Sequence, residues 1–125
     1  MEKIEAFFFD SYAFYEIFAK NKNYEKYTKE VIIVTTKLNL MEVHYGLLRK
    51  YGKETADNYY GEFVKYTVEI KDEMIKEANV FRLHEIERRL SYVDCMGYII
   101  AKMMKIKFLT GDKQFKNLEN VEYVK

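Results

Sequence analysis

The sequence contains no proline, only five glycines and a single cysteine, Cys95. Without prolines and with few glycines, no linker, repeat or low-complexity segment stands out, so we expect one domain over residues 1–125. A single cysteine excludes an internal disulfide bond. No apolar run approaches the roughly 18 residues that cross a bilayer, and the opening MEKIEAFFFD does not resemble a signal peptide. We therefore expect a cytoplasmic protein that does not contact a membrane.

An excess of charge of one sign is also missing, since 21 basic and 20 acidic residues give a net charge of +1. Bulk charge therefore does not indicate a nucleic-acid-binding protein, and any such site must come from a local arrangement of side chains. With 49% hydrophobic and 33% charged residues, the composition is typical of a globular domain.

Short apolar or β-branched runs alternate with longer segments of helical periodicity. We expect strands at Ala6–Phe9, Val31–Thr35, Thr67–Ile70, Lys107–Thr110 and Val121–Val124. We expect helices from Ser11, at about Tyr24–Lys29, from Thr36 to Gly52, at Glu54–Tyr66, at Lys71–Arg89 and from Ser91. This order predicts an α/β fold, a three-layer α/β/α sandwich with a mostly parallel central sheet. Such sheets place their functional crevice beyond the carboxyl ends of the strands.

Local signals add detail to three helices. Ser11 is expected to cap the first helix, and Ser91 and Asp94 fit a capping box at the start of the last one. In the helix from Thr36 to Gly52, apolar residues at helical spacing predict the buried face. These residues are Leu38, Met41, Tyr45 and Leu48.

Four acidic residues stand where this fold would hold its chemistry. Asp10 and Asp112 follow two predicted strands, Glu42 borders the apolar stripe of its helix, and Asp94 lies in the first turn of the last helix. Mg²⁺ and Mn²⁺ prefer carboxylate oxygens, and a bound cation can lower the pKa of water and polarise a phosphodiester. Converging carboxylates repel one another, so the cluster makes physical sense mainly if a cation neutralises it.

Each acid also has a purely structural interpretation. Asp10 and Asp112 can belong to turns, Asp94 can complete the capping box, and Glu42 can reach solvent or pair with a lysine. The residues alone leave both interpretations open.

At these positions the sequence resembles the PIN-domain family. FFFDSYAFYEIF, around Asp10, is similar to the opening strand and helix of that family. LNLMEVHYGLLRKYG, around Glu42, resembles its second motif. RLSYVDCMGYIIAKMMKIKFLTGDKQF resembles the last two motifs, with acids at Asp94 and Asp112 and a hydroxyl at Thr110. The order and spacing agree over nearly the whole chain.

The resemblance implies a Mg²⁺- or Mn²⁺-dependent endoribonuclease. Small members are commonly VapC-type toxins of toxin–antitoxin pairs, neutralised by a protein antitoxin and usually homodimeric. It further implies metal ligands at Asp10, Glu42, Asp94 and Asp112, with the Thr110 hydroxyl directed toward the site. Tyr12 departs from the family, because many of these toxins carry a small hydroxyl residue two positions after the first acid.

Other residues suggest contacts around this site. Lys113 and Lys116 flank Asp112 and are candidates for binding RNA phosphates, although a solvated surface is the alternative for both. The further basic candidates are Lys37, Arg88 and Arg89. Aromatic residues crowd residues 12–27, so we expect some of them to be exposed and to contact an antitoxin, a second subunit or RNA bases. We expect His44 and His84 to have no metal role and Cys95 to pack in the core.

The function that we expect is hydrolysis of RNA phosphodiester bonds by the acidic residues with Mg²⁺ or Mn²⁺. One alternative is a non-catalytic module of the same fold that binds RNA or a protein. Another is a metal-dependent DNA nuclease, because carboxylate–metal sites do not by themselves select the sugar.

Overall fold

The computed structural model describes residues 4–125. A four-stranded sheet forms the centre, with the strands in the order β2-β1-β3-β4 and every pair of neighbours parallel. The strands are β1 (Glu5–Phe9), β2 (Val31–Val34), β3 (Lys107–Thr110) and β4 (Val121–Tyr123). The longer helices are α1 (Ser11–Phe18), α2 (Lys37–Tyr51), α3 (Lys53–Phe63), α4 (Asp72–His84) and α5 (Tyr92–Met103). Short 3-10 turns are η1 (Lys22–Thr28), η2 (Val64–Tyr66), η3 (Ile86–Arg88) and η4 (Lys113–Phe115).

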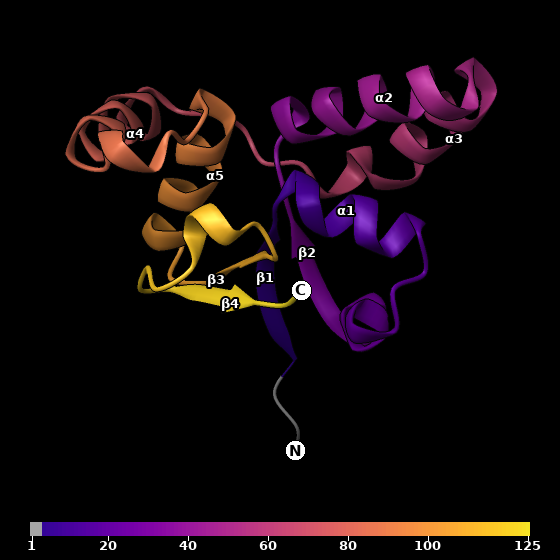
Figure 1. Ribbon diagram of the computed structural model, residues 1–125, viewed down its shortest axis with the longest axis horizontal. Helices are drawn as coiled ribbons and strands as arrows, with labels where there is room; N and C mark the ends of the chain where they lie inside the picture. Colours follow the sequence, from indigo (N-terminus) through magenta and orange to yellow (C-terminus); the bar gives the residue numbers. More distant parts are fainter. Residues whose placement is uncertain (1–3) are drawn as a thin grey trace.

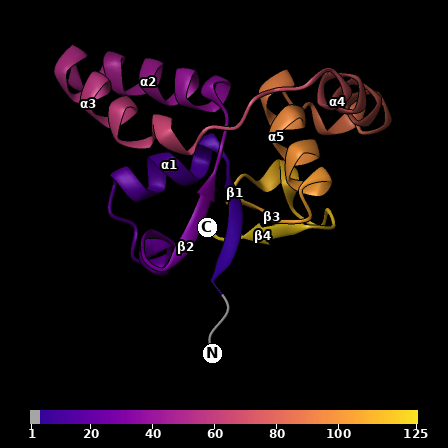
Figure 2. The same cartoon turned by 180° about the vertical axis from the view of Figure 1, so that it is seen from behind.

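The helices cover the two faces of the sheet, α1 to α3 on one side and α4 and α5 on the other (Figures 1 and 2). Alternation along β1 explains the two cores: Phe7 and Phe9 pack among residues of α1, α2 and α3, whereas Phe8 packs against α5 and Phe108. The predicted three-layer α/β/α class is therefore confirmed. Among residues 4–125, no helix combines the length and apolar character needed to cross a membrane.

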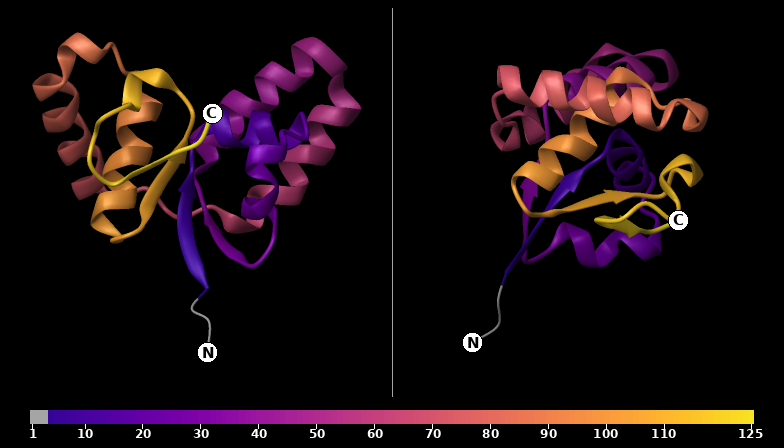
Figure 3. Two further views of the ribbon diagram at one scale, coloured as in Figure 1. Left: turned by 60° about the horizontal axis from the view of Figure 1, so that its bottom comes forward. Right: turned by 90° about the vertical axis from the view of Figure 1, so that its left-hand side faces the viewer.

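The strand order places a topological switch point at β1 and β3. The chain leaves β1 toward β2 on one side of the sheet, and later returns to place β3 on the other side of β1. The carboxyl ends of these central strands lie between the α2–α3 and α4–α5 helix pairs, as Figure 3 shows from two further directions. A crevice at this point is where parallel α/β sheets bind ligands.

Two predicted elements differ from the structure. Thr67–Ile70 is not a strand, because only one isolated bridge joins Thr67 to Thr35 at the end of β2. The helix predicted at Lys71–Arg89 is too long: α4 ends at His84, and the chain turns through η3 to Arg89, which has a φ of 57°. This turn brings Leu90 into the core.

The predicted buried face of α2 is also wrong. The side chains that pack into the core are Leu40, Val43 and Leu47, while Met41 and Tyr45 are 58% and 61% exposed. Both stripes have helical spacing, so periodicity alone cannot distinguish them. The outer stripe leaves an apolar surface on α2.

The aromatic residues of the first 27 positions are packed instead of exposed. Tyr24 and Tyr27 are buried, and their hydroxyls donate hydrogen bonds to the Val124 carbonyl and the Glu122 carboxylate. Phe14 is fully buried, and Tyr12, Tyr15 and Phe18 are partly buried. The prediction of exposed aromatics here was wrong, because η1 folds back to form a second packing surface for these rings.

Candidate functional site

Asp10 lies at the centre of the candidate site, directly after β1. Its backbone N–H donates to the Leu109 carbonyl at 3.1 Å, which extends the pairing of β1 with β3. The side chain is 3% exposed, and its Oδ2 accepts a hydrogen bond of 2.7 Å from the Thr110 hydroxyl. Oδ1 is buried without a hydrogen-bond partner among the described residues. A buried carboxylate oxygen normally has a partner, so this oxygen indicates a place for a ligand.

The Thr110 hydroxyl connects the backbone of Asp112 to the side chain of Asp10. The Thr110 hydroxyl accepts a hydrogen bond from the Asp112 backbone N–H at 3.1 Å while it donates to Asp10. Asp112 Oδ1 accepts from the Gln114 backbone N–H at 3.0 Å, which fixes the η4 turn. The structural interpretation of Asp112 as a turn residue is therefore correct, and its charge also raises the pKa of Asp94.

Glu42 reaches the same region from α2 through two polar residues. The Ser11 hydroxyl donates to Glu42 Oε1 at 2.6 Å, and the Asn39 side-chain amide donates to the Ser11 hydroxyl at 3.1 Å. Thr36 caps α2, and its hydroxyl donates to Asn39 Oδ1 at 2.7 Å. Ser11 does not cap α1 as predicted, since its hydroxyl is directed across to Glu42.

Sequence reasoning missed Asn39 and the role of Ser11. Asn39 is fully buried although it is polar, and it lies one helical turn before Glu42 on the same face of α2. The sequence did carry a signal for Asn39: it is a polar residue on the inward face of the helix, three positions before the candidate ligand Glu42.

Asp94 forms the predicted capping box. Its carboxylate accepts from the Ser91 backbone N–H at 2.9 Å, and its own backbone N–H donates to the Ser91 hydroxyl at 3.0 Å. The capping role does not remove Asp94 from the site, because its negative charge raises the pKa values of both Asp10 and Glu42.

Each of the four acids raises the pKa of at least one other acid or has its own pKa raised by one. Burial, reinforced by the charges of Asp94 and Glu42, raises the pKa of Asp10 to about 7 despite the opposing Thr110 and Ser11 hydrogen bonds. Burial also raises the pKa of Glu42, with Asp94 adding to the shift. The pKa of Asp94 is raised by burial and by the charge of Asp112, against the hydrogen bonds from Ser91. Like charges therefore face one another across β1, α2, α5 and the turn after β3.

No basic side chain among residues 4–125 forms an ion pair with any of these four acids, although six ion pairs occur elsewhere. The donor set consists of oxygens only, which Mg²⁺ and Mn²⁺ prefer. Within the described residues, no three acidic, histidine or cysteine side chains are close enough to form a complete metal-binding group. The uncompensated charge and the unpaired Asp10 oxygen thus fit a divalent cation, while the side chains do not form a closed coordination shell.

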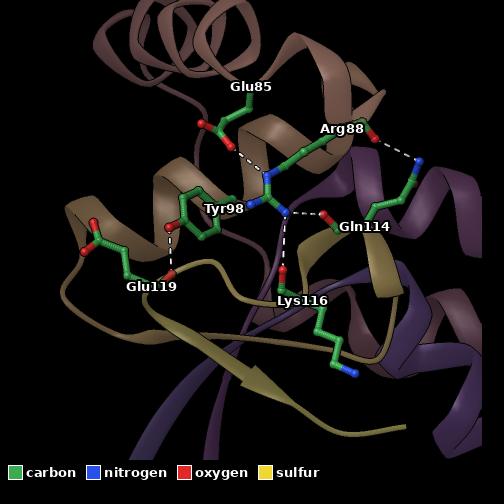
Figure 4. A network of polar contacts seen from close by, with 6 residues as sticks. All are labelled: Glu85, Arg88, Tyr98, Gln114, Lys116 and Glu119. Carbon is green, nitrogen blue, oxygen red and sulfur yellow. Dashed lines mark hydrogen bonds and ion pairs between the residues drawn. The ribbon is translucent and has the colours of Figure 1, made fainter.

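The other candidates occupy different environments. Lys113 and Lys116 are exposed on and after η4, next to Asp112. Arg88 is structural: it pairs with Glu85, and its guanidinium donates to the carbonyls of Gln114 and Lys116 (Figure 4).

The remaining residues have no part in the acidic region. His44 bonds to Asp57 on the next helix at 2.8 Å, and Lys37, His84 and Arg89 are exposed. Cys95 is buried as predicted, and burial raises the pKa of its thiol to about 11.

The protein is thus a parallel α/β domain whose acidic residues lie around the carboxyl ends of its two central strands, at the topological switch point. Residues 7–121 match the profile of the PIN domain, and the chain belongs to that family. A comparison with curated protein sequences finds no match.

Solved structures share the fold. VapC20 of Mycobacterium tuberculosis, described as a toxin that cleaves the sarcin–ricin loop, aligns with a TM-score of 0.80 at 16% identity, over 95% of this chain and 99% of that one. The VapBC2 complex of Rickettsia felis with promoter DNA aligns with a TM-score of 0.73 at 17% identity, over 96% of this chain and 99% of that one. A DNA-bound VapBC complex of Salmonella typhimurium has a TM-score of 0.75 at 13% identity, over 95% and 96% of the two chains.

Proposed function

We propose that this protein is a Mg²⁺- or Mn²⁺-dependent endoribonuclease. The observation that carries the proposal is the group of four acids at the switch point, which has no basic partner among residues 4–125 and contains a buried carboxylate oxygen without a hydrogen bond there. Isolated buried charge is costly, and a fold keeps it where a ligand or a reaction requires it.

Asp10, Glu42, Asp94 and Asp112 would hold the cation. When bound there, it supplies Lewis acidity toward a phosphodiester and lowers the pKa of water. The hydrogen bond from Thr110 holds Asp10 in one orientation, and the one from Ser11 does the same for Glu42. Thr36 in turn holds Asn39, and Asn39 holds the Ser11 hydroxyl, so the orientation of Glu42 is supported by a chain of buried hydrogen bonds.

The proposal includes a toxin role with a protein antitoxin in the cytoplasm. Two of the structural relatives are VapBC toxin–antitoxin complexes, and a third is described as a toxin that cleaves the sarcin–ricin loop. The outer stripe of α2 leaves Met41 and Tyr45 exposed, which supports a protein partner or a second copy of the chain. We place the homodimer contact on this stripe.

The experiment compares RNA cleavage by wild type, Asp10→Asn and a matched control, Asp57→Asn. Asp57 is an exposed acid that pairs with His44 and Lys53, outside the acidic group. With Mg²⁺ or Mn²⁺, wild type and Asp57→Asn should cleave labelled RNA, EDTA should stop both, and Asp10→Asn should lose at least about a hundredfold in rate. Equal rates for Asp10→Asn and wild type would contradict the proposal. A parallel DNA oligonucleotide decides between ribonuclease and DNA nuclease.

A second candidate is a non-catalytic binding module of the same fold. It is favoured by one observation, that the described side chains do not form a complete metal-binding group. A titration with Mn²⁺ separates the two functions. If Mn²⁺ shifts neither the thermal unfolding of the wild type nor its activity on RNA, the binding module replaces the nuclease.

A further inference from the structure

Tyr12 and Tyr123 both lie near the end of β3, beside the acidic group. Tyr12 lies on the first turn of α1, and Tyr123 on β4 is the register partner of Thr110. The Tyr12 ring packs against Gly111, where an added Cβ would come within 2.4 Å of Tyr12 Cε1 and 2.2 Å of the Val124 carbonyl oxygen. Only glycine permits this approach, so the Thr110–Asp112 segment passes between α1 and the chain end after β4.

These two tyrosines differ from the tyrosines that support the fold. Five tyrosines use their hydroxyls for hydrogen bonds to carbonyls or carboxylates: Tyr15, Tyr24, Tyr27, Tyr59 and Tyr98. Within residues 4–125, the hydroxyls of Tyr12 and Tyr123 form no such bond, and both rings are only partly buried. The negative charge of Asp112 and the nearby Tyr123 contribute to raising the pKa of Tyr12, after burial and Glu16, which agrees with their proximity.

Two lysines extend the same surface. Lys113 and Lys116 are exposed, and no carboxylate of the described residues lies within ion-pair distance of either. The Lys116 ammonium lies 6.0 Å from the centre of the Tyr123 ring. Lys113 and Lys116 therefore supply positive charge beside an otherwise acidic site.

The turn that carries the lysines is held in place. Arg88 Nη1 donates to the carbonyls of Gln114 and Lys116 at 3.0 and 3.3 Å, and the Gln114 side chain donates back to the Arg88 carbonyl at 3.0 Å (Figure 4). The two lysines therefore project from a fixed backbone, which reduces the entropy lost when they bind a ligand.

We propose that Tyr12, Tyr123, Lys113 and Lys116 form a binding strip for single-stranded RNA, with the tyrosines stacking on bases and the lysines contacting phosphates. Partly exposed rings next to unpaired lysines are the combination that binds single strands, because unpaired bases offer their faces and duplex bases do not. The strip rests on the proposed function for its substrate, and what it adds is the set of residues that hold the RNA beside the acids.

The test measures binding without cleavage, by fluorescence anisotropy of a labelled single-stranded RNA of about twelve nucleotides in EDTA, with its duplex in parallel. Tyr12→Leu and Tyr123→Leu should each weaken single-strand binding about tenfold and leave duplex binding unchanged. Tyr12→Phe should bind within about twofold of wild type, because it keeps the ring. Tyr51→Leu, an exposed tyrosine at the far end of α2, is the control.

Wild-type affinity in both leucine variants would overturn the strip, and so would a Tyr12→Phe variant as weak as Tyr12→Leu. If a leucine variant does not fold, photo-crosslinking of thiouridine-substituted RNA to the wild type gives the answer. Crosslinks should fall on peptides that carry Tyr12 or Tyr123, and crosslinks confined to other peptides would refute the proposal. Because binding is read in EDTA, failure of RNA cleavage would remove the proposed function and leave the strip standing.

Discussion

Raising the pH in metal-free buffer should destabilise this fold, because ionisation of Asp10 places a charge at a position with one unpaired oxygen. Burial and the neighbouring acids raise the pKa of Asp10 to about 7, against its ordinary value of 3.8. The folded state therefore holds this proton more tightly than the unfolded state. The stability from the protonated form is fully present below the unfolded pKa and is lost as the pH rises through the folded pKa.

The magnitude follows from the size of the shift. A shift of about three pKa units corresponds to about 4 kcal/mol at about 1.4 kcal/mol per unit. Between about pH 4 and pH 8, the free energy of unfolding should fall by up to this amount through Asp10 alone. Asp10→Asn removes the ionisation and keeps the shape, so it should be more stable than wild type at about pH 8 by about 2–4 kcal/mol.

Urea denaturation followed by circular dichroism in EDTA, at about pH 5 and pH 8, measures the effect. The raised pKa values of Glu42 and Asp94 act in the same direction, so the difference between wild type and Asp10→Asn isolates Asp10. Glu62→Gln, which changes an exposed acid, serves as the control. If Asp10→Asn and wild type show parallel pH dependence, the burial and repulsion assigned to Asp10 are wrong.

Further measurements test other parts of the structure. At about 100 times its dissociation constant, Mn²⁺ should stabilise the wild type by about 2.7 kcal/mol and Asp10→Asn by much less; equal thermal shifts would contradict a site at Asp10. Asn39→Ala should cost about 1–3 kcal/mol in urea denaturation, because it removes one hydrogen bond from each of two buried hydroxyls, those of Thr36 and Ser11. Gly97→Ala should cost about 1–3 kcal/mol, since the new Cβ would lie 2.6 Å from the Phe8 ring, and an unchanged midpoint would refute that contact. Met41→Glu should convert the proposed dimer to a monomer in sedimentation velocity, and an unchanged mass would place the dimer contact elsewhere.

Much of the fold could be predicted from local patterns. The apolar run before Asp10 and the β-branched run at 31–34 form strands, and Gly52 ends α2 with a φ of 95° that glycine adopts easily. The capping box of Ser91 and Asp94 forms as predicted. These features depend on neighbours within a few positions, so the sequence specifies them without knowledge of the tertiary structure.

The errors share a physical cause. The outer stripe of α2 and the inner one are both apolar at helical spacing, and only contact with β1 and α1 decides which is buried. The aromatics of residues 12–27 were predicted to be partly exposed because one helix cannot bury them, yet the fold supplies a second surface through η1 and the chain end. Thr67–Ile70 has strand-like residues, but only Thr67 meets a partner.

By itself, the sequence determined the order of strands and helices, the caps, and which acids follow the strands. Tertiary structure alone decided that Asp10 and Asp112 share the Thr110 hydroxyl, that Ser11 and Asn39 orient Glu42, and that the four charges act on one another. The two sets of features differ in how far apart along the chain the interacting residues lie. Caps and strand ends are set by interactions within about one turn of chain, whereas the pKa of Asp10 depends on Asp94 and Glu42, which only the folded sheet and helices bring near it.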